Sequence, residues 1–423
     1  MGLNDVAWEQ LFDRYSILEE ISRYGYFEIS ANQIKQYREP RLMTKFDNRV
    51  NLPEIFRENR LAILPISRGD YTISPFMAYK DLEPPHPNME RVRIPTHLQS
   101  LMPQFIVSEA IALNCAYACG ILHDFLEEDE ITPTVSGRMS SGIFPFTILL
   151  ENGEDLTIEV NNSQIEIDAA YEGLQSLTLF EAKRDLADDF LVRQLYYPFR
   201  AWHERVTKPV KSVFLVFSNG IFSLYQYEFE YFDDYNSLIL TKQNNYAIAT
   251  DISLADIENI VASIEVIAEP DIQFPQADDM SRIVNLIELL SVSALSKQDI
   301  TSEYAFDERQ TNYYTDAGRY LGLIDKNREA GEIAFQLSPL GRHIMRQDQR
   351  TRQLEIAFHI LQHKPFYETM LLHLRHGIMP NRRTIMQIMR ESDLFRVRAD
   401  STYFRRASTV ISWINWILGI IDD

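Results

Sequence analysis

Apolar residues recur every three or four positions in several stretches of the chain, and this spacing predicts amphipathic helices. In the first eighty residues the spacing covers one segment that ends at Gly25, and its apolar positions are Trp8, Leu11, Phe12, Tyr15, Leu18 and Ile21. A Ser30 cap predicts a short helix over 32–37. Two apolar runs, 61–66 and 71–73, flank a Ser-Arg-Gly-Asp turn and predict a β-hairpin. Helices closed by a hairpin predict a separate module over residues 1–80.

The middle of the chain mixes helical and strand-like patterns. Clustered prolines mark residues 81–104 as a linker, and an apolar helix is expected over 108–127. After a turn-rich passage come three strand-like runs, a helix and a hairpin about Asn219-Gly220. The expected ranges are 132–138 for the turns, 144–150, 165–171 and 177–182 for the strands, 188–205 for the helix, and 213–217 with 221–228 for the hairpin. This order predicts an α/β core with a mixed sheet over residues 105–250.

The last third of the chain has mainly helical spacing. Residues 251–279 are acidic, contain two prolines and indicate a connector. Helices are then expected at 282–290, 297–304 and 308–323, followed by a strand at 335–341 that leads into another helix. The order is repeated more loosely by helices at 355–362, 366–374, 382–391 and 401–418. We therefore expect two helix-turn-helix modules, over 280–345 and 346–423.

The composition is that of an ordinary globular protein, with 45% hydrophobic and 24% charged residues. A length of 423 residues indicates two to four domains. The net charge of −20, taken alone, argues against a nucleic-acid-binding protein. Cys115 and Cys119 lie one helical turn apart, which suits two small buried side chains better than a disulfide or a metal site. No signal peptide and no long apolar span are visible, so we expect a cytoplasmic protein without a membrane partner.

Two of the apolar strand runs end in charged groups. A short turn at Glu172-Gly173 would pair them as a hairpin and bring Asp168 beside Glu181, while strand alternation puts Glu181 and Lys183 on one face. Two carboxylates at a strand end suit Mg²⁺, which leaves coordination positions for water and phosphate. Such an ion would activate a water molecule for attack. Lys183 could orient or deprotonate that water, or it could stabilise the negative charge that develops at the phosphorus centre. The alternative is a surface hairpin with solvated charges.

This passage resembles the PD-(D/E)XK nuclease superfamily, with Asp168 as the first acid and Glu181-Ala182-Lys183 as the (D/E)XK element. Gln194, on the following helix, and Glu109, at the start of an earlier one, also match the family pattern. The resemblance implies that all five are catalytic, that Asp168 and Glu181 bind the metal, and that the cofactor is Mg²⁺, with Mn²⁺ as a substitute. Two alternatives remain open: Glu109 could simply complement the helix dipole, and Gln194 could be an ordinary solvated helix residue.

Positive charge is concentrated near the C-terminus, where residues 341–410 hold 13 Lys and Arg against 6 Asp and Glu. Two segments, beginning at Glu308 and at Asp400, resemble the recognition helices of winged helix-turn-helix domains, and the N-terminal module has a basic cluster and a winged-helix-like pattern. Arg138, between small residues, could hold a phosphate. The expected DNA-binding residues are Arg38, Arg41, Arg138, Arg309, Gln310, Tyr313, Tyr403, Arg405 and Arg406. For the two helices, protein–protein packing remains an alternative to DNA binding. For the N-terminal basic cluster the alternative is contact with another domain, and for Arg138 it is a plain polar turn.

These features together resemble a Type II restriction endonuclease, a multidomain α/β plus α+β protein with a PD-(D/E)XK core and N-terminal and tandem C-terminal winged-helix-like domains. The resemblance implies site-specific, Mg²⁺-dependent hydrolysis of double-stranded DNA that leaves 5′-phosphate and 3′-hydroxyl ends. We expect a homodimer, assembled before or on DNA, and a cognate DNA methyltransferase in the same restriction–modification system that is not a stable partner. A structure- or modification-dependent repair or defence nuclease and a non-catalytic DNA-binding regulator remain alternatives.

Overall fold

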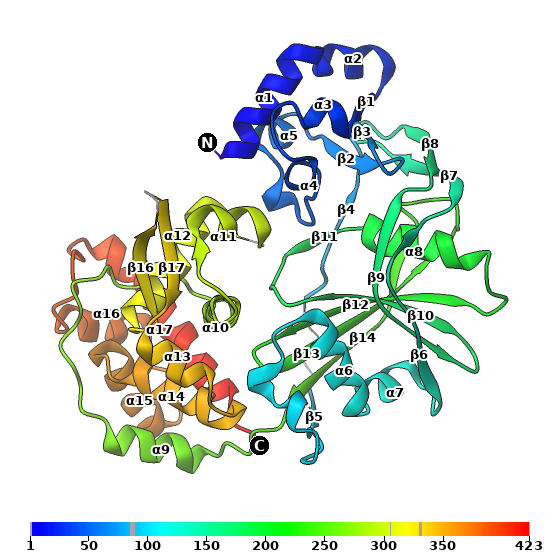
Figure 1. Cartoon of the computed structure of the whole chain (residues 1–423). Helices are drawn as coiled ribbons and strands as arrows, with labels where there is room; N and C mark the ends of the chain where they lie inside the picture. Colours follow the sequence, from blue (N-terminus) through cyan, green and yellow to red (C-terminus); the bar gives the residue numbers. More distant parts are fainter. Residues whose placement is uncertain (1, 85–88, 305, 330–331, 423) are drawn as a thin grey trace.

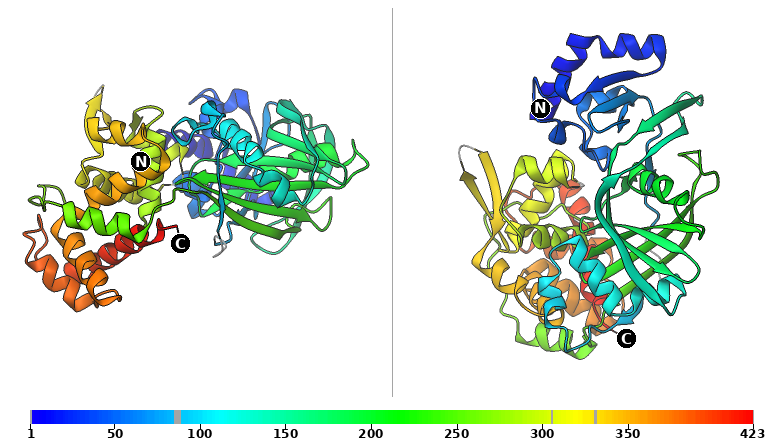
Figure 2. Two further views of the ribbon diagram at one scale, coloured as in Figure 1. Left: turned by 90° about the horizontal axis from the view of Figure 1, so that it is seen from below. Right: turned by 45° about the vertical axis from the view of Figure 1, so that its right-hand side comes forward.

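The computed structural model describes residues 2–84, 89–304, 306–329 and 332–422 (Figures 1 and 2). Three parts follow one another along the chain. In Figure 1 the N-terminal module is blue, the central sheet domain is cyan to green, and the C-terminal helical module runs from the green helix α9 through yellow to red. The three parts lie around a common centre, so that each of them adjoins the other two.

The N-terminal module packs short helices on a three-stranded antiparallel sheet of order β1-β3-β2. Its elements are α1 (Leu3–Tyr15), α2 (Ile17–Tyr24), β1 (Phe27–Ser30), α3 (Ala31–Ile34), α4 (Pro40–Met43), the 3₁₀ turn η1 (Arg49–Asn51), α5 (Glu54–Glu58), β2 (Ala62–Pro65) and β3 (Asp70–Ser74). The first predicted helix is in fact two helices, because Ser16 adopts a left-handed φ of 48°. The Ser30 cap and the β2–β3 hairpin are confirmed.

The central domain is built on a seven-stranded mixed sheet of order β5-β14-β13-β12-β10-β9-β6, which confirms the predicted α/β class. Its strands are β5 (Glu90–Val92), β6 (Ile131–Ser140), β9 (Gln164–Gly173), β10 (Leu177–Lys183), β12 (Val210–Ser218), β13 (Ile221–Phe229) and β14 (Leu238–Ile248). The helices are α6 (Glu109–Ala118), α7 (Ile121–Leu126) and α8 (Arg193–His203), and the 3₁₀ turns η2 (Gln99–Leu101) and η3 (Pro103–Phe105) precede them. Because side chains alternate along a strand, Val213 and Leu215 pack with α6 and α7 while Phe214 and Val216 pack with α8.

Several predictions for the central domain are wrong in detail. The passage 132–138 is part of strand β6, whose polar residues are largely exposed because β6 lies at the sheet edge, where Pro133 is tolerated. Gly120, with a φ of 77°, separates α6 from α7. The predicted linker contributes β5. Strand β4 (Tyr79–Asp81), which ends at the first linker residue, pairs with β11 (Asp189–Leu191) and so delays the start of α8 to Arg193. The strand predicted at 144–150 is β7 (Ile143–Leu149), and it pairs with β8 (Asp155–Asn161) outside the main sheet.

The C-terminal module is mostly helical, and its elements pack around a single apolar core whose residues run from Ile252 to Ile420. Its elements are α9 (Leu254–Ser263), α10 (Met280–Leu290), β15 (Leu295–Ser296), α11 (Lys297–Glu303), α12 (Glu308–Tyr320), β16 (Ile324–Glu329), β17 (Glu332–Leu337), α13 (Pro339–Met345), α14 (Gln349–Leu361), α15 (Lys364–His376), α16 (Arg382–Arg390) and α17 (Asp400–Gly419). The strands form a sheet of order β15-β17-β16. The connector contains α9, which starts at a Ser253 cap, and its apolar residues join the core, so it is not a plain linker.

Helix α10 fixes the C-terminal module against the central sheet. The Asn285 side chain donates to the backbone oxygen of Arg184 at 2.6 Å, just after β10. Glu288 accepts hydrogen bonds from Ser218 and Asn219 in the β12–β13 turn. Within the part of the chain that the structure describes, no helix is long and apolar enough to span a membrane.

Candidate active site

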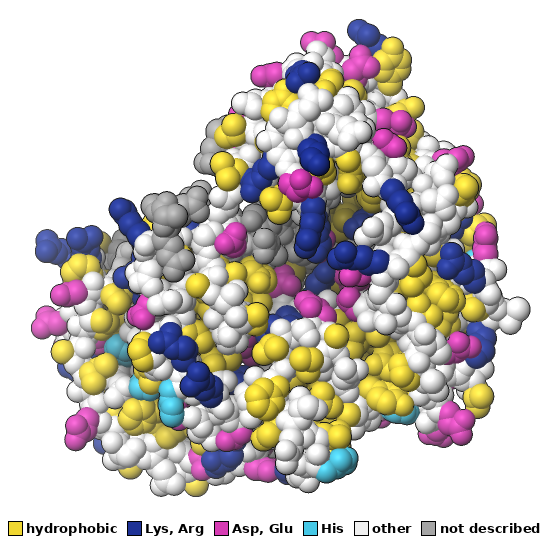
Figure 3. Space-filling view, in the orientation of Figure 1, with side chains coloured by type: hydrophobic (Ala, Val, Ile, Leu, Met, Phe, Trp, Pro, Cys, Tyr) yellow, Lys and Arg dark blue, Asp and Glu magenta, His cyan; other side chains and the backbone are white. Residues whose placement is uncertain are grey.

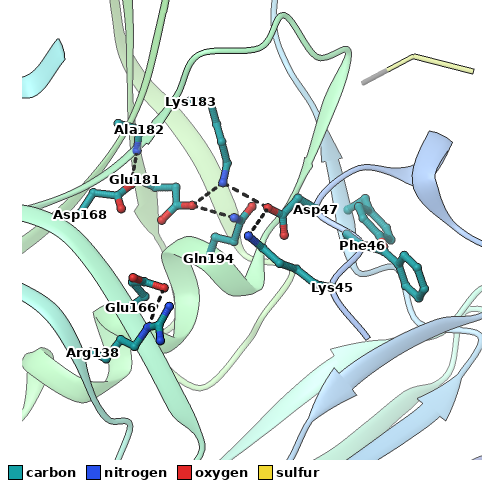
Figure 4. Close-up of polar contacts among 11 residues, drawn as sticks. Lys45, Phe46, Asp47, Arg138, Glu166, Asp168, Glu181, Ala182, Lys183 and Gln194 are labelled. Carbon is teal, nitrogen blue, oxygen red and sulfur yellow. Dashed lines mark hydrogen bonds and ion pairs between the residues drawn. The ribbon is translucent and has the colours of Figure 1, made fainter. Parts of the chain in front are cut away.

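The predicted hairpin is formed by β9 and β10, which pair antiparallel from Glu172 opposite Leu177 to Ala169 opposite Phe180. The next pair in this register is Asp168 and Glu181, where the backbone pairing stops. Instead, Asp168 Oδ2 accepts a hydrogen bond from the backbone nitrogen of Ala182 at 2.8 Å. The carboxylate of Asp168 therefore lies against the strand that carries Glu181 (Figure 4).

Glu181 is the centre of a polar network. Its Oε1 atom lies 2.8 Å from Nζ of Lys183, on the same face of β10, as strand alternation predicted. The same oxygen accepts a hydrogen bond from Nε2 of Gln194 at 2.7 Å. Gln194 is in the first turn of α8, so the helix that follows the hairpin fixes the orientation of this carboxylate. Figure 4 shows Glu181 between Asp168 on one side and Lys183 and Gln194 on the other.

The N-terminal module contributes a second carboxylate to Lys183. Oδ2 of Asp47 lies 3.3 Å from Lys183 Nζ and 3.9 Å from Lys45 Nζ. The segment that carries Asp47 is fixed to the central domain, because the backbone nitrogen of Leu191 donates to the Asp47 backbone oxygen at 2.9 Å. Sequence reasoning missed Asp47: it lies in the basic cluster of residues 33–49, and no local pattern indicates that it contacts a residue far along the chain.

These groups line one cavity of about 330 Å³. Carboxylates and cations are nearly balanced on its wall, and the charged lining residues are Asp47, Glu109, Glu166, Asp168 and Glu181, with Lys45, Arg138, Lys183 and Arg193. Figure 3 shows acidic and basic side chains next to one another in the hollow where the three parts of the molecule meet. Glu109 is the first residue of α6, whose start is capped by Ser108. The fold thus brings all five predicted catalytic residues to one cavity, although they come from four elements.

Burial changes the acid–base properties of the site. It raises the pKa of Glu181 to about 7, and the negative charge of Asp168 adds to the shift while Lys183 opposes it. Burial also raises the pKa of Asp168. For Lys183, burial alone would lower the pKa, but the carboxylates of Glu181 and Asp47 raise it well above its usual value. Asp47 keeps a pKa below the ordinary range, because Lys183 and Lys45 outweigh its burial.

Several buried polar atoms of the cavity residues have no partner in the described structure, namely Oδ1 of Asp47, Oε1 of Gln194 and Nε of Arg193. Buried polar atoms are normally paired with protein, water or a ligand. No three Asp, Glu, His or Cys side chains among the described residues are placed to hold an ion by themselves. Mg²⁺ requires less than that, because it usually keeps several waters and binds through one or two carboxylates. Asp168 and Glu181 therefore fit Mg²⁺ with its water shell.

The predicted DNA-binding residues are not equally accessible. Arg138, on β6, is 62% exposed, lines the cavity and forms an ion pair with Glu166 at 3.3 Å. Arg41 at α4 is exposed, and Arg38 just before α4 is half-buried. In the C-terminal module, Arg405 is exposed.

Other members of that set are engaged within the protein. The Gln310 side chain caps α12 by accepting from the Asp307 backbone nitrogen. Exposed Arg309 donates from Nε to the Tyr313 hydroxyl at 2.8 Å. Tyr403 is buried and donates to the Val397 backbone oxygen. Arg406 is also buried. Contact of Gln310 or Tyr403 with DNA would therefore compete with contacts that stabilise the fold.

Three family models match the chain, each over less than half of it. Residues 5–73, 74–247 and 282–422 match three models that are each described as a domain of unknown function (DUF6996, DUF6997 and DUF7226, respectively). Searches of curated proteins and of solved structures find no match. The boundaries of these matches at residues 73–74 and 247–282 separate the same three parts that are seen in the fold.

Proposed function

We propose that the protein is a Mg²⁺-dependent, site-specific double-stranded DNA endonuclease similar to Type II restriction enzymes of the PD-(D/E)XK superfamily. The observation that carries this proposal is the convergence of Asp168, Glu181 and Lys183, with Gln194 and Glu109, on one cavity at the end of a β-hairpin. A hairpin with solvated charges would not bury a carboxylate to 12% side-chain exposure beside a lysine.

Asp168 and Glu181, with Glu109 nearby, would hold the ion, which would offset the charge of the scissile phosphate and make a bound water more acidic. Gln194 donates to Glu181 and so fixes the orientation of a carboxylate that would hold the ion. The raised pKa of Lys183 favours a protonated side chain. Of the roles proposed for this lysine, stabilisation of the phosphorane-like charge is therefore better supported than deprotonation of the water.

Arg138, Arg193 and Lys45 are the remaining cations of the cavity wall. They could contact the phosphates that flank the scissile one, because guanidinium groups match phosphate oxygens in pairs. Arg138 would first have to leave Glu166, an exchange that costs little for an exposed ion pair.

The assignment of winged-helix domains is supported by the order of elements in residues 280–337. Helix α10, strand β15, helices α11 and α12, and strands β16 and β17 follow one another around a small antiparallel sheet. In winged helix-turn-helix domains of this order, the helix before the two strands enters the major groove. That helix is α12, which carries exposed Arg309. The helices and hairpin of residues 3–74 support the same assignment for the N-terminal module.

Incubation of the protein with plasmid DNA and Mg²⁺ tests the proposal. We expect discrete fragments, no cleavage with EDTA, and loss of cleavage in Lys183→Ala while DNA binding is retained. Lys211→Ala, on the neighbouring strand β12 but outside the cavity, is the matched control and should cleave normally. A smear would favour the repair or defence nuclease, whereas binding without cleavage by the wild-type protein would favour a regulator. Normal cleavage by Lys183→Ala would refute the active-site assignment.

A further inference from the structure

A second cavity, of about 300 Å³, lies beside the first turns of α17. Its wall includes three arginines, Arg382 from α16 and Arg405 and Arg406 from α17, together with Phe404. Asp278 is the only acidic residue among the described lining residues, and its Oδ1 accepts a hydrogen bond from Thr409. The cavity is therefore strongly cationic in a protein whose net charge is −20.

Two of the three arginines, Arg382 and Arg406, differ from freely solvated surface arginines. The guanidinium of Arg382 lies 4.5 Å from the centroid of the Phe404 ring, in a cation–π contact that fixes its plane. Arg406 is only 2% exposed, and its Nη1 has no hydrogen-bond partner in the described structure. Burial, together with the charge of Arg405, lowers the pKa of Arg406 to about 10. A buried guanidinium without a carboxylate is costly, and an anion in the cavity would remove that cost.

We propose that this cavity binds a phosphate of the DNA backbone, with Arg405 and Arg382 as its direct contacts and Arg406 as the cation behind them. Guanidinium groups in pairs match the oxygens of a phosphate, and Phe404 presents Arg382 in one orientation. The choice of DNA as the source of the phosphate rests on the proposed function.

The surroundings of the cavity favour a polymer over a single nucleotide. Tyr313 on α12 lies close enough to Arg406 to act on its charge, and Arg309 donates to the hydroxyl of Tyr313. The cavity therefore lies near α12, which carries exposed Arg309. A phosphate bound there would anchor the backbone beside the helix that is proposed to read the bases, which is the usual role of phosphate contacts in setting register.

Fluorescence anisotropy with a labelled DNA duplex in EDTA tests the inference, because no cleavage can occur. The dependence of log affinity on log salt should become shallower by about one in Arg405→Ala and in Arg382→Ala, because each removes one phosphate contact. Binding should weaken equally for unrelated duplex sequences. Both side chains are exposed, so folding should be preserved, and circular dichroism checks this. Arg375→Ala is the matched control: it removes an exposed arginine of the same module that does not line the cavity, and it should bind like the wild-type protein.

Phe404→Ala should reproduce the Arg382→Ala defect, and adding it to Arg382→Ala should weaken binding little further. Wild-type binding and salt slope in both arginine variants would overturn the proposal. So would tight binding of free deoxynucleoside monophosphate that Arg405→Ala abolishes, because the cavity would then serve a small ligand. Failure of the nuclease proposal is seen separately: a protein that does not cleave with Mg²⁺ can still show these binding defects in EDTA.

Discussion

The raised pKa of Glu181 predicts that Mg²⁺ binding depends on pH in the neutral range. Its side chain is 12% exposed, and burial holds its pKa at about 7 in the metal-free protein. Under the proposed function, Mg²⁺ would bind the ionised carboxylate, so the proton would have to leave when the ion enters. The affinity for Mg²⁺ should therefore rise as the pH rises through about 7. An ordinary glutamate, with a pKa near 4.3, would show no such change.

The size of the effect follows from the ionised fraction of Glu181. With a pKa of about 7, roughly one tenth of the carboxylates are ionised at about pH 6 and roughly nine tenths at about pH 8. The apparent dissociation constant for Mg²⁺ should therefore be about tenfold higher at the lower pH, which corresponds to about 1.4 kcal/mol. Asp168, whose pKa is also raised, would act in the same direction.

Isothermal titration of the DNA-free protein with Mg²⁺ at several pH values measures this dependence. Repeating the titration in two buffers with different ionisation heats reports the protons released, and we expect Glu181 to release about 0.9 at about pH 6, falling to about 0.1 at about pH 8. Glu181→Gln should bind Mg²⁺ more weakly and lose most of the pH dependence in this range. An equal Mg²⁺ affinity at the two ends of the range in the wild-type protein, with no proton release, would refute the reasoning.

Three further predictions concern stability and positioning. Glu181→Gln removes a buried charge and should raise the free energy of unfolding at pH 8 by at most about 3 kcal/mol, with a higher melting temperature. This gain should shrink as the pH falls from about 7 to about 4.5, because the wild-type carboxyl then becomes protonated in both states. Asp47→Asn removes one of the two carboxylates of Lys183 and should reduce cleavage about tenfold, a loss of about 1.4 kcal/mol of transition-state stabilisation that single-turnover kinetics measure. Gly220→Ala places a Cβ 2.5 Å from Nε2 of Gln349 at a φ of +75°, and should cost about 1–3 kcal/mol in denaturant unfolding.

Matched substitutions separate these effects from general damage. Asp81→Asn, on the strand that pairs with β11, alters an exposed carboxylate outside the cavity and should leave cleavage near the wild-type rate. Gly69→Ala changes a turn glycine with open space around it and should be nearly neutral for stability. Wild-type cleavage by Asp47→Asn would show that Glu181 alone positions Lys183. A melting temperature of Glu181→Gln below that of the wild type at pH 8 would contradict the burial argument.

Sequence reasoning located the parts of the site that depend on local structure. Asp168 and Glu181 lie on adjacent strands of one hairpin, and Gln194 follows on the next helix, so alternation and short connections were enough to associate them. The contact between Asp47 and Lys183 joins two modules and depends on the pairing of the 45–49 segment with β11. No periodicity in the chain encodes that pairing.

Exposure was harder to predict than position. The first turn of α17 has a polar pattern, yet Tyr403 and Arg406 are buried while Phe404 is half exposed, because the packing partners of α17 lie in α10, α15 and α16. Similarly, β6 has few apolar residues, so its sequence resembles a series of turns. As an edge strand it needs few, because one side of it pairs with β9 and the other faces solvent.

The acidic net charge and a DNA ligand are compatible because the two cavities differ in charge. The candidate active-site cavity has five acidic and four basic residues on its wall, so without a bound cation it offers no net attraction to a phosphate. The cavity beside α17 has three basic residues and one acidic residue, and that acid is engaged by Thr409. Removal of Mg²⁺ should therefore affect the two differently: phosphate contacts at Lys183 should be lost, whereas those at Arg405 should persist. DNA affinity measured in EDTA would then report mainly the C-terminal module, and the additional affinity of uncleaved duplex gained with Ca²⁺, which also takes carboxylate oxygens as ligands, would report the candidate active-site cavity.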